Sequence, residues 1–227
     1  MSLPADSFSR LQACANAHRV TIFDLLTAAI AAYLFRVTGE KRQAIGVPFM
    51  RRMGSVALNS TAPVVNVLPL CIDVDAGASL LTIATGVKKE MREARRHQRY
   101  DAEQIQRDIG LVGSGRALYG PVINYRMFDY DLRFGAVEGR THRLAVGPVD
   151  DIEFGIVMAE EQVEFELRGH SALYNEADLD RHGARLARLI DAFLHEESII
   201  VSDLPVMDHD EEALIAEASR GPLVERP

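Results

Sequence analysis

Residues 152–168 read IEFGIVMAEEQVEFELR and contain two runs in which the apolar residues are spaced two apart. In the second run, Val163, Phe165 and Leu167 are separated by charged residues. Alternation with a period of two is typical of a β-strand that is buried on one face only. Residues 159–161 are a short polar connection between the runs, so the stretch predicts an antiparallel hairpin with one wet face.

Helical periodicity flanks this hairpin on both sides. Residues 21–37 start at Thr21 with Asp24 three positions later, which resembles a capping box, and Gly39 ends their apolar stripe. Similar stripes predict helices over 79–98 and over 178–195, the latter capped by Asn175. We also predict shorter helices after Asp6 and over 102–109, strands over 43–50, 64–74, 121–125 and 141–146, and an extended piece over 199–204. Helices beside a mixed, largely antiparallel sheet give an α+β two-layer sandwich.

The composition limits the class of protein. The 227 residues fit one large domain with a tail, and 48% of them are hydrophobic. There are 25 basic and 33 acidic residues, a net charge of −8, which is unfavourable for a general nucleic-acid binder. The longest apolar run, residues 25–35, is too short to span a membrane, and the start does not resemble a signal peptide.

Cysteine use and missing motifs narrow the chemistry. Cys14 and Cys71 stand far apart among apolar neighbours, so we expect free buried thiols, a cytoplasmic protein and no structural zinc site. The chain has no phosphate-binding loop and no nucleophile elbow, and residues 113–115 predict only a flexible loop. Asp150, Asp151 and Glu153 could bind a metal, but a turn before a strand is the favoured interpretation.

One histidine has the spacing of a catalytic base. His97 and Asp101 form a His-x-x-x-Asp pattern, which several acyltransferases use with the histidine as general base. However, Arg96 replaces the expected companion histidine and Ala102 the expected glycine. The alternative is a histidine at a helix C-terminus followed by an N-cap aspartate.

A basic stripe follows one side of the helix predicted over 79–98. It comprises Lys88, Arg92, Arg95, Arg96 and Arg99. Either the stripe is a solvated face with intrahelical ion pairs, or it docks an acidic partner or a phosphate.

Five ordered motifs carry a family resemblance. They are VPFMRRMGS at 47–55, PVVNVLPL at 63–70, RRHQRYDAE at 95–103, GPVINYRMFDY at 120–130 and GPVDD at 147–151. Together they resemble the later motifs of nonribosomal peptide synthetase condensation domains, in particular those of siderophore synthetases. The resemblance implies a chloramphenicol acetyltransferase-like lobe over 1–204 and a linker toward an adenylation domain over 205–227.

The resemblance also implies a function. Such domains have two similar lobes, and a tunnel between them admits two phosphopantetheine arms. The catalytic His-His-x-x-x-Asp-Gly motif of the first lobe is absent here. The chain is therefore expected to be the second lobe, inactive alone, with no catalytic residue and no cofactor of its own.

The expected partners are the first lobe, aryl or peptidyl carrier proteins that bear the phosphopantetheine, and the adenylation domain. The residues expected to support the tunnel or the lobe interface are Arg51, Arg52, Asn66, Asn124, Asp150 and Asp151, and the basic stripe is expected to dock a carrier. Many relatives carry arginine where this chain has Cys71, so no charge role is expected there. The alternatives are a docking or scaffold module, or a small acyltransferase that uses His97.

Overall fold

The computed structural model describes residues 2–4, 6–51, 59, 61, 64–126, 132–139, 147–159 and 162–221. Its main sheet has five strands in the order β2-β1-β3-β6-β7. The strands are β1 (Arg42–Met50), β2 (Val65–Asp73), β3 (Val122–Arg126), β6 (Ile152–Ala159) and β7 (Gln162–Gly169). β1–β2 and β6–β7 are antiparallel, whereas β1–β3 and β3–β6 are parallel. The mixed sheet and the predicted hairpin are confirmed; the strand expected over 141–146 lies outside the described residues.

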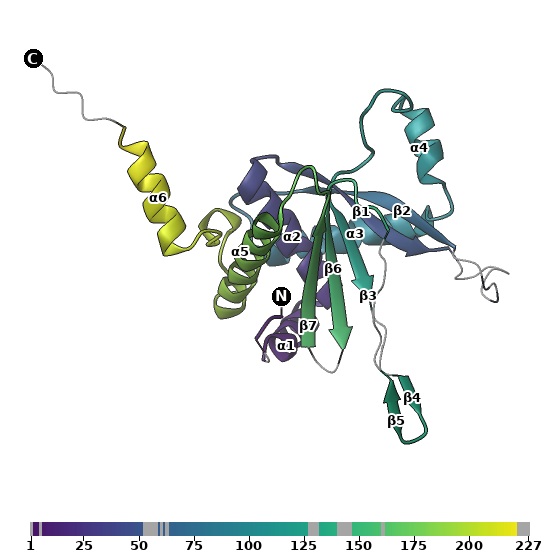
Figure 1. The fold of residues 1–227 in the computed structure, drawn as a ribbon, viewed down its shortest axis with the longest axis horizontal. Helices are drawn as coiled ribbons and strands as arrows, with labels where there is room; N and C mark the ends of the chain where they lie inside the picture. Colours follow the sequence, from purple (N-terminus) through teal and green to yellow (C-terminus); the bar gives the residue numbers. More distant parts are fainter. Residues whose placement is uncertain are drawn as a thin grey trace, which may run out of the picture.

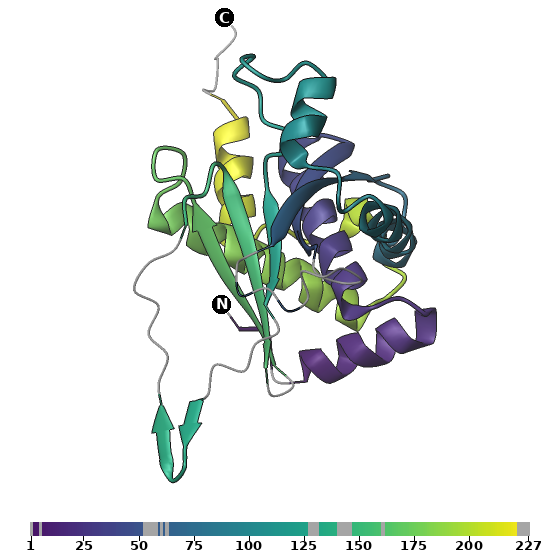
Figure 2. The ribbon, with the colours of Figure 1, turned by 90° about the vertical axis from the view of Figure 1, so that its right-hand side faces the viewer.

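One face of the sheet carries the helices. They are α1 (Ser7–His18), α2 (Ile22–Thr38), α3 (Leu80–Arg96) and α5 (Glu176–His195). Figure 1 looks onto the opposite face, where no described helix covers β3, β6 and β7, and in Figure 2 α1, α2 and α3 lie to one side of the strands while α5 runs behind them. This arrangement confirms the two-layer α+β sandwich.

Helix α2 is the centre of the helical layer. Its N-terminus has the predicted capping box, in which Thr21 accepts from the Asp24 N–H and the Asp24 carboxylate accepts from the Thr21 N–H, and Gly39 ends it with φ 76°. Residues 28–32 are all at most 3% exposed, so the helix is buried on every side. A helix that is apolar all round is a core helix, and α2 contacts α1, α3, α5 and β1.

The alternating strands form the other side of the core. Phe154 of β6 and Phe165 of β7 are at most 1% exposed, and Ile123 of β3 is fully buried. Burying side chains of this size stabilises a fold by about 1.5–3 kcal/mol each. The register places Ile156 opposite Phe165, which keeps the apolar residues of both strands on the helical side.

A small hairpin departs from the body. β4 (Leu132–Phe134) and β5 (Val137–Gly139) pair only with each other, away from the main sheet in Figures 1 and 2. Phe134 is 68% and Val137 65% exposed. These short strands were not predicted, because three residues are too few for a periodic signal.

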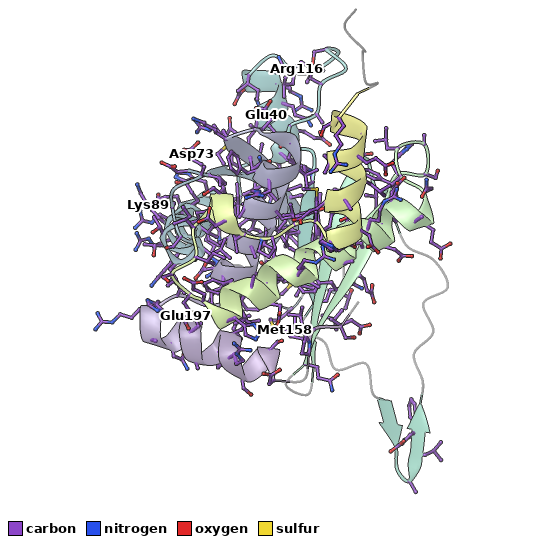
Figure 3. The ribbon with its side chains drawn as sticks, turned by 90° about the vertical axis from the view of Figure 1, so that its left-hand side faces the viewer. Glu40, Asp73, Lys89, Arg116, Met158 and Glu197 are labelled. Atoms are coloured by element: carbon purple, nitrogen blue, oxygen red, sulfur yellow. The ribbon has the colours of Figure 1, made fainter. Side chains whose placement is uncertain are left out.

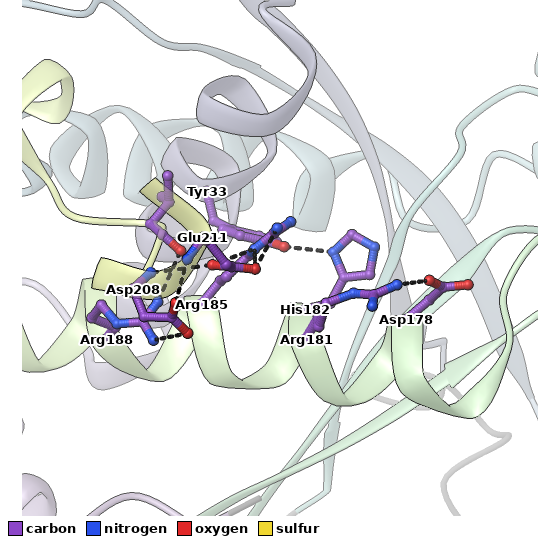
Figure 4. Close-up of polar contacts among 9 residues, drawn as sticks. Tyr33, Asp178, Arg181, His182, Arg185, Arg188, Asp208 and Glu211 are labelled. Atoms are coloured by element: carbon purple, nitrogen blue, oxygen red, sulfur yellow. Dashed lines mark hydrogen bonds and ion pairs between the residues drawn. The ribbon is translucent and has the colours of Figure 1, made fainter. Parts of the chain in front are cut away.

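The last described segment is partly helical. Residues 201–203 form a short 3₁₀ turn, η2 (Val201–Asp203), so the extended piece expected over 199–204 is wrong apart from one bridge between Ile200 and Ser79. Beyond it, α6 (His209–Ser219) lies within the segment predicted as a linker, and this linker role stays a prediction. Figure 4 shows how α6 is held: Glu211 pairs with Arg185 of α5 at 2.7 Å, and Arg188 reaches Asp208 at 3.4 Å.

Within the described part of the chain, no single helix has both the length and the hydropathy to cross a membrane. Only α1 and α2 taken together meet that test, and they meet at an angle of 101°. Both cysteines are free thiols; Cys14 is buried as expected, whereas Cys71 is half-buried.

Candidate functional site

The uncovered face of the sheet carries a ladder of charged side chains. Arg126 of β3 donates to Glu166 of β7 at 2.6 Å, passing across Gly155 of β6. Next to it, Glu153 pairs with Arg168, its register partner on β7, at 2.5 Å. Because Gly155 has no side chain, the guanidinium of Arg126 can lie close against β6. Asn124 of β3 adds a 3.3 Å hydrogen bond to Glu153.

This ladder is unusually buried for an uncovered face. The side chains of Arg126 and Glu153 are only 12% and 11% exposed. The Nε atoms of Arg126 and Arg168 are buried and have no hydrogen-bond partner among the described residues. An unpaired buried donor costs about 1–3 kcal/mol, so a surface that brings acceptors to this face would be stabilised there.

A second polar cluster holds the loop between α3 and α4 (Ala102–Asp108). The side chain of Asn66 donates to the carbonyls of Gln98 and Tyr100 and accepts from the Ala102 N–H, at 2.7–3.2 Å. Asn66, which lies on β2, is only 7% exposed. Its side-chain oxygen accepts from the first N–H of α4, so a residue of the sheet caps this helix.

Arg51 binds the same loop. It pairs with the Asp101 carboxylate at 2.5 Å and donates to the Arg99 carbonyl at 2.6 Å. Asp101 precedes α4 as expected for an N-cap, but its side chain makes no capping hydrogen bond, because Arg51 engages it.

A third cluster joins the start of β6 to α5. The Tyr174 hydroxyl donates to Asp151 at 2.8 Å, and the Tyr174 ring lies edge-on to His182. The Tyr33 hydroxyl meets His182 Nδ1 at 2.5 Å, as Figure 4 shows. Burial lowers the pKa of His182 and raises the pKa of Tyr33 to about 12, so both groups are neutral near pH 7. The cluster therefore links β6 to the helical layer without a buried charge at His182.

The basic stripe is exposed to solvent, as expected from the sequence. Lys88, Arg92, Arg95 and Arg96 are exposed on α3, and Arg99 is exposed just beyond it. Arg96 pairs with Glu93 at 3.0 Å, whereas Arg92 and Arg95 make no hydrogen bond or ion pair with any residue that the structure describes. Their two guanidinium groups are available to a partner.

His97 ends α3 beside an apolar pocket of about 380 Å³. The pocket lies between α3, β2 and α4, and Leu68, Pro69, Ala94, His97, Tyr100 and Ile105 line it. Arg51 engages the Asp101 carboxylate, and among the described residues no carboxylate orients the His97 ring as a His-x-x-x-Asp base requires.

The predicted support residues do not gather at one point. Arg51 and Asn66 hold the loop before α4, Asn124 lies on the uncovered face, and Asp151 with exposed Asp150 lies at the start of β6. Arg52 lies outside the described residues. Their roles in a tunnel or interface stay predictions.

Three residues of the charged ladder, Arg126, Glu166 and Arg168, were not predicted as site residues. Of the three carboxylates that could bind a metal, Asp151 accepts from Tyr174, Glu153 pairs with Arg168, and Asp150 is exposed. The sequence contains one signal for Arg126 and Arg168: both lie at positions that alternation assigns to the solvent-facing side of a strand.

Comparisons with known proteins agree on one family. The condensation domain model matches residues 1–216. The chain is 40% identical over 195 residues to enterobactin synthase component F of Escherichia coli K12, and 40% identical over 168 residues to vanchrobactin synthetase VabF of Vibrio anguillarum. These matches cover 86% and 74% of this chain but only 15% and 6% of the relatives, which are much longer proteins.

Solved structures agree with the fold. The first condensation domain of the CDA synthetase superposes with a TM-score of 0.80 at 24% identity, over 92% of this chain and 47% of that one. The starter condensation domain of rhizomide synthetase RzmA, in complex with C8-CoA and Leu-SNAC, gives a TM-score of 0.78 at 28% identity over similar shares. The chain thus spans about half the length of these domains. It belongs to the family of condensation domains of nonribosomal peptide synthetases.

Proposed function

We propose that this chain is the second lobe of a condensation domain and that it forms an amide bond only together with a first lobe. The reactants would be a donor acyl thioester and an acceptor aminoacyl thioester, each on the phosphopantetheine arm of a carrier protein. The likeness to enterobactin and vanchrobactin synthetases favours an aryl donor, a serine-like acceptor and a siderophore product made in the cytoplasm. An adenylation domain would follow the chain.

The charged ladder carries this proposal. A buried ion pair is costly unless its remaining polar atoms are satisfied, and here two arginine Nε donors have no described partner. A first lobe packed on this face would supply acceptors and close one wall of a tunnel. Amide formation from a thioester depends mainly on positioned reactants, so a lobe can contribute walls and docking surfaces without a base of its own.

The activity test mixes donor-loaded and acceptor-loaded carrier proteins with the chain and follows the amide product by mass spectrometry. We expect no product from the chain alone and product when a first lobe is supplied, equally with the wild type and with His97→Ala. Product from the chain alone that His97→Ala abolishes would replace this proposal with the small acyltransferase.

The docking test reverses charges on the basic stripe in the two-lobed enzyme. Carrier proteins are commonly acidic, so Arg92→Glu with Arg96→Glu should weaken carrier binding, most strongly at low salt. Reversing exposed Arg42 and Arg181, which lie on β1 and α5, is the matched control and should leave binding unchanged. Equal affinity of both double variants at every salt concentration would identify the stripe as a solvated face.

A further inference from the structure

Three metal-ligating side chains meet away from the sheet. Cys14 and His18 lie one turn apart on α1, and Glu197 follows the end of α5. His18 Nε2 is 3.2 Å from Glu197 Oε2, and the thiol sulfur, the imidazole nitrogen and a carboxylate oxygen all lie within 4.8 Å of one another. Figure 3 shows Glu197 beside α1, on the helical side of the molecule.

The donor set and its spacing fit a particular ion. Zinc binds sulfur at about 2.3 Å and nitrogen or oxygen at about 2.0–2.2 Å in a tetrahedral arrangement, so its ligand atoms lie about 3.5 Å apart. The His18 and Glu197 donors, 3.2 Å apart, are close to that separation already, and the Cys14 sulfur lies within 4.8 Å of both. Cys14 is 2% exposed, whereas the side chains of His18 and Glu197 are 43% and 45% exposed. An ion can therefore enter from solvent, and water can fill the fourth position.

We propose that Cys14, His18 and Glu197 bind a zinc ion that joins α1 to the segment after α5. On binding, the Cys14 thiol loses its proton to solvent and a sulfur–zinc bond forms, with no change of oxidation state. The site adds to an existing contact, because Arg10 of α1 already donates to the Leu194 carbonyl of α5. It is independent of the proposed condensation function, and it replaces the expectation of no zinc site.

The test uses metal-free chain without a histidine tag and adds Co²⁺ alone, followed by Zn²⁺ in competition. We expect visible bands typical of four-coordinate cobalt and a near-ultraviolet sulfur-to-cobalt charge-transfer band, both displaced by Zn²⁺. Cys14→Ser should remove the charge-transfer band. His18→Ala, which changes a half-exposed position and should fold normally, should weaken Zn²⁺ affinity at least about 10-fold, the scale on which changes around zinc ligands act.

Two matched variants serve as controls. Cys71→Ser removes the other free thiol, and His195→Ala removes an exposed histidine at the end of α5; both should retain the spectrum and the affinity. Zn²⁺ should also raise the melting temperature of the wild type but not of His18→Ala, since a ligand that binds only the folded state stabilises it. A wild type without the charge-transfer band, or a band that survives Cys14→Ser, would overturn the proposal.

Discussion

Replacing Gly155 with alanine would put a methyl group where the Arg126 guanidinium now lies. An ideal Cβ at this position would be well under 3.0 Å from Arg126 Nη2 and 3.1 Å from the backbone oxygen of Glu166. The arginine is the flexible partner, so it must move. Because it is ion-paired with Glu166 and only 12% exposed, moving it breaks the pair.

The expected cost follows from that displacement. Overpacking a filled position costs about 1–3 kcal/mol, so we expect Gly155→Ala to destabilise the chain by about 2 kcal/mol. For a protein of this size that lowers the melting temperature by about 4–8 °C. In an Arg126→Ala background the clash with the guanidinium is absent, and the contact with the Glu166 backbone oxygen remains. There, Gly155→Ala should cost clearly less, since only that contact must relax and alanine restricts the unfolded chain more than glycine does.

The assay is a double-mutant cycle measured by urea unfolding, with Arg126→Ala alone as the reference for the second background. The reasoning is refuted if Gly155→Ala costs the same in both backgrounds. That result would assign the strain to the backbone of β7 instead of to the arginine.

Three further predictions concern the other polar clusters. Asn66→Ala leaves two carbonyls and one N–H without their partner, so it should cost about 2 kcal/mol and speed proteolysis between α3 and α4; unchanged cleavage would contradict the role of Asn66. Arg185 lowers the pKa of Glu211, so their pair stabilises α6 above the ordinary pKa of 4.5, and this stabilisation is lost as the pH falls through the lower folded value; the protection of the α6 amides, measured relative to the intrinsic exchange rate at each pH, should therefore fall in acid, and Glu211→Gln should flatten that fall. Burial raises the pKa of Tyr33 from 10.0 to about 12, so stability that is full below pH 10 should decline between pH 10 and 12; denaturant midpoints should show this decline, and Tyr33→Phe should reduce it.

Local patterns were sufficient for much of the architecture. The alternation at residues 152–168 predicts the β6–β7 hairpin and its buried face, and both the Thr21 and the Asn175 caps form as the sequence indicates. Helix α6 was recoverable too, since Asp208 and Glu211 have the spacing of a capping box. It was missed because its large apolar residues, Leu214 and Ile215, are adjacent in the sequence and give no helical stripe; both are exposed in the structure.

The candidate sites could not be predicted in the same way, because each brings together residues that are far apart in the sequence. Arg126 and Glu166 are 40 residues apart, and their contact requires the order β3-β6-β7 as well as the register. Asn66 caps a helix that begins 36 residues later. Glu197 meets His18 across 179 residues, so a motif search for closely spaced ligands could not find that cluster.

The joint between β1 and β3 has the fewest described register pairs in the main sheet. Among the described residues these strands share one register pair, Gly46 with Val122, whereas β1 and β2 share nine. The ring of Tyr119 lies against Gly46 at this joint, where a side chain would collide with it. Separating the β1–β2 ribbon from β3-β6-β7 at this joint would therefore break fewer described register pairs than dividing the sheet at any other strand boundary. The sheet thus consists of two well-bonded parts, β1–β2 and β3-β6-β7, and the buried helix α2 contacts β1 behind the joint between them.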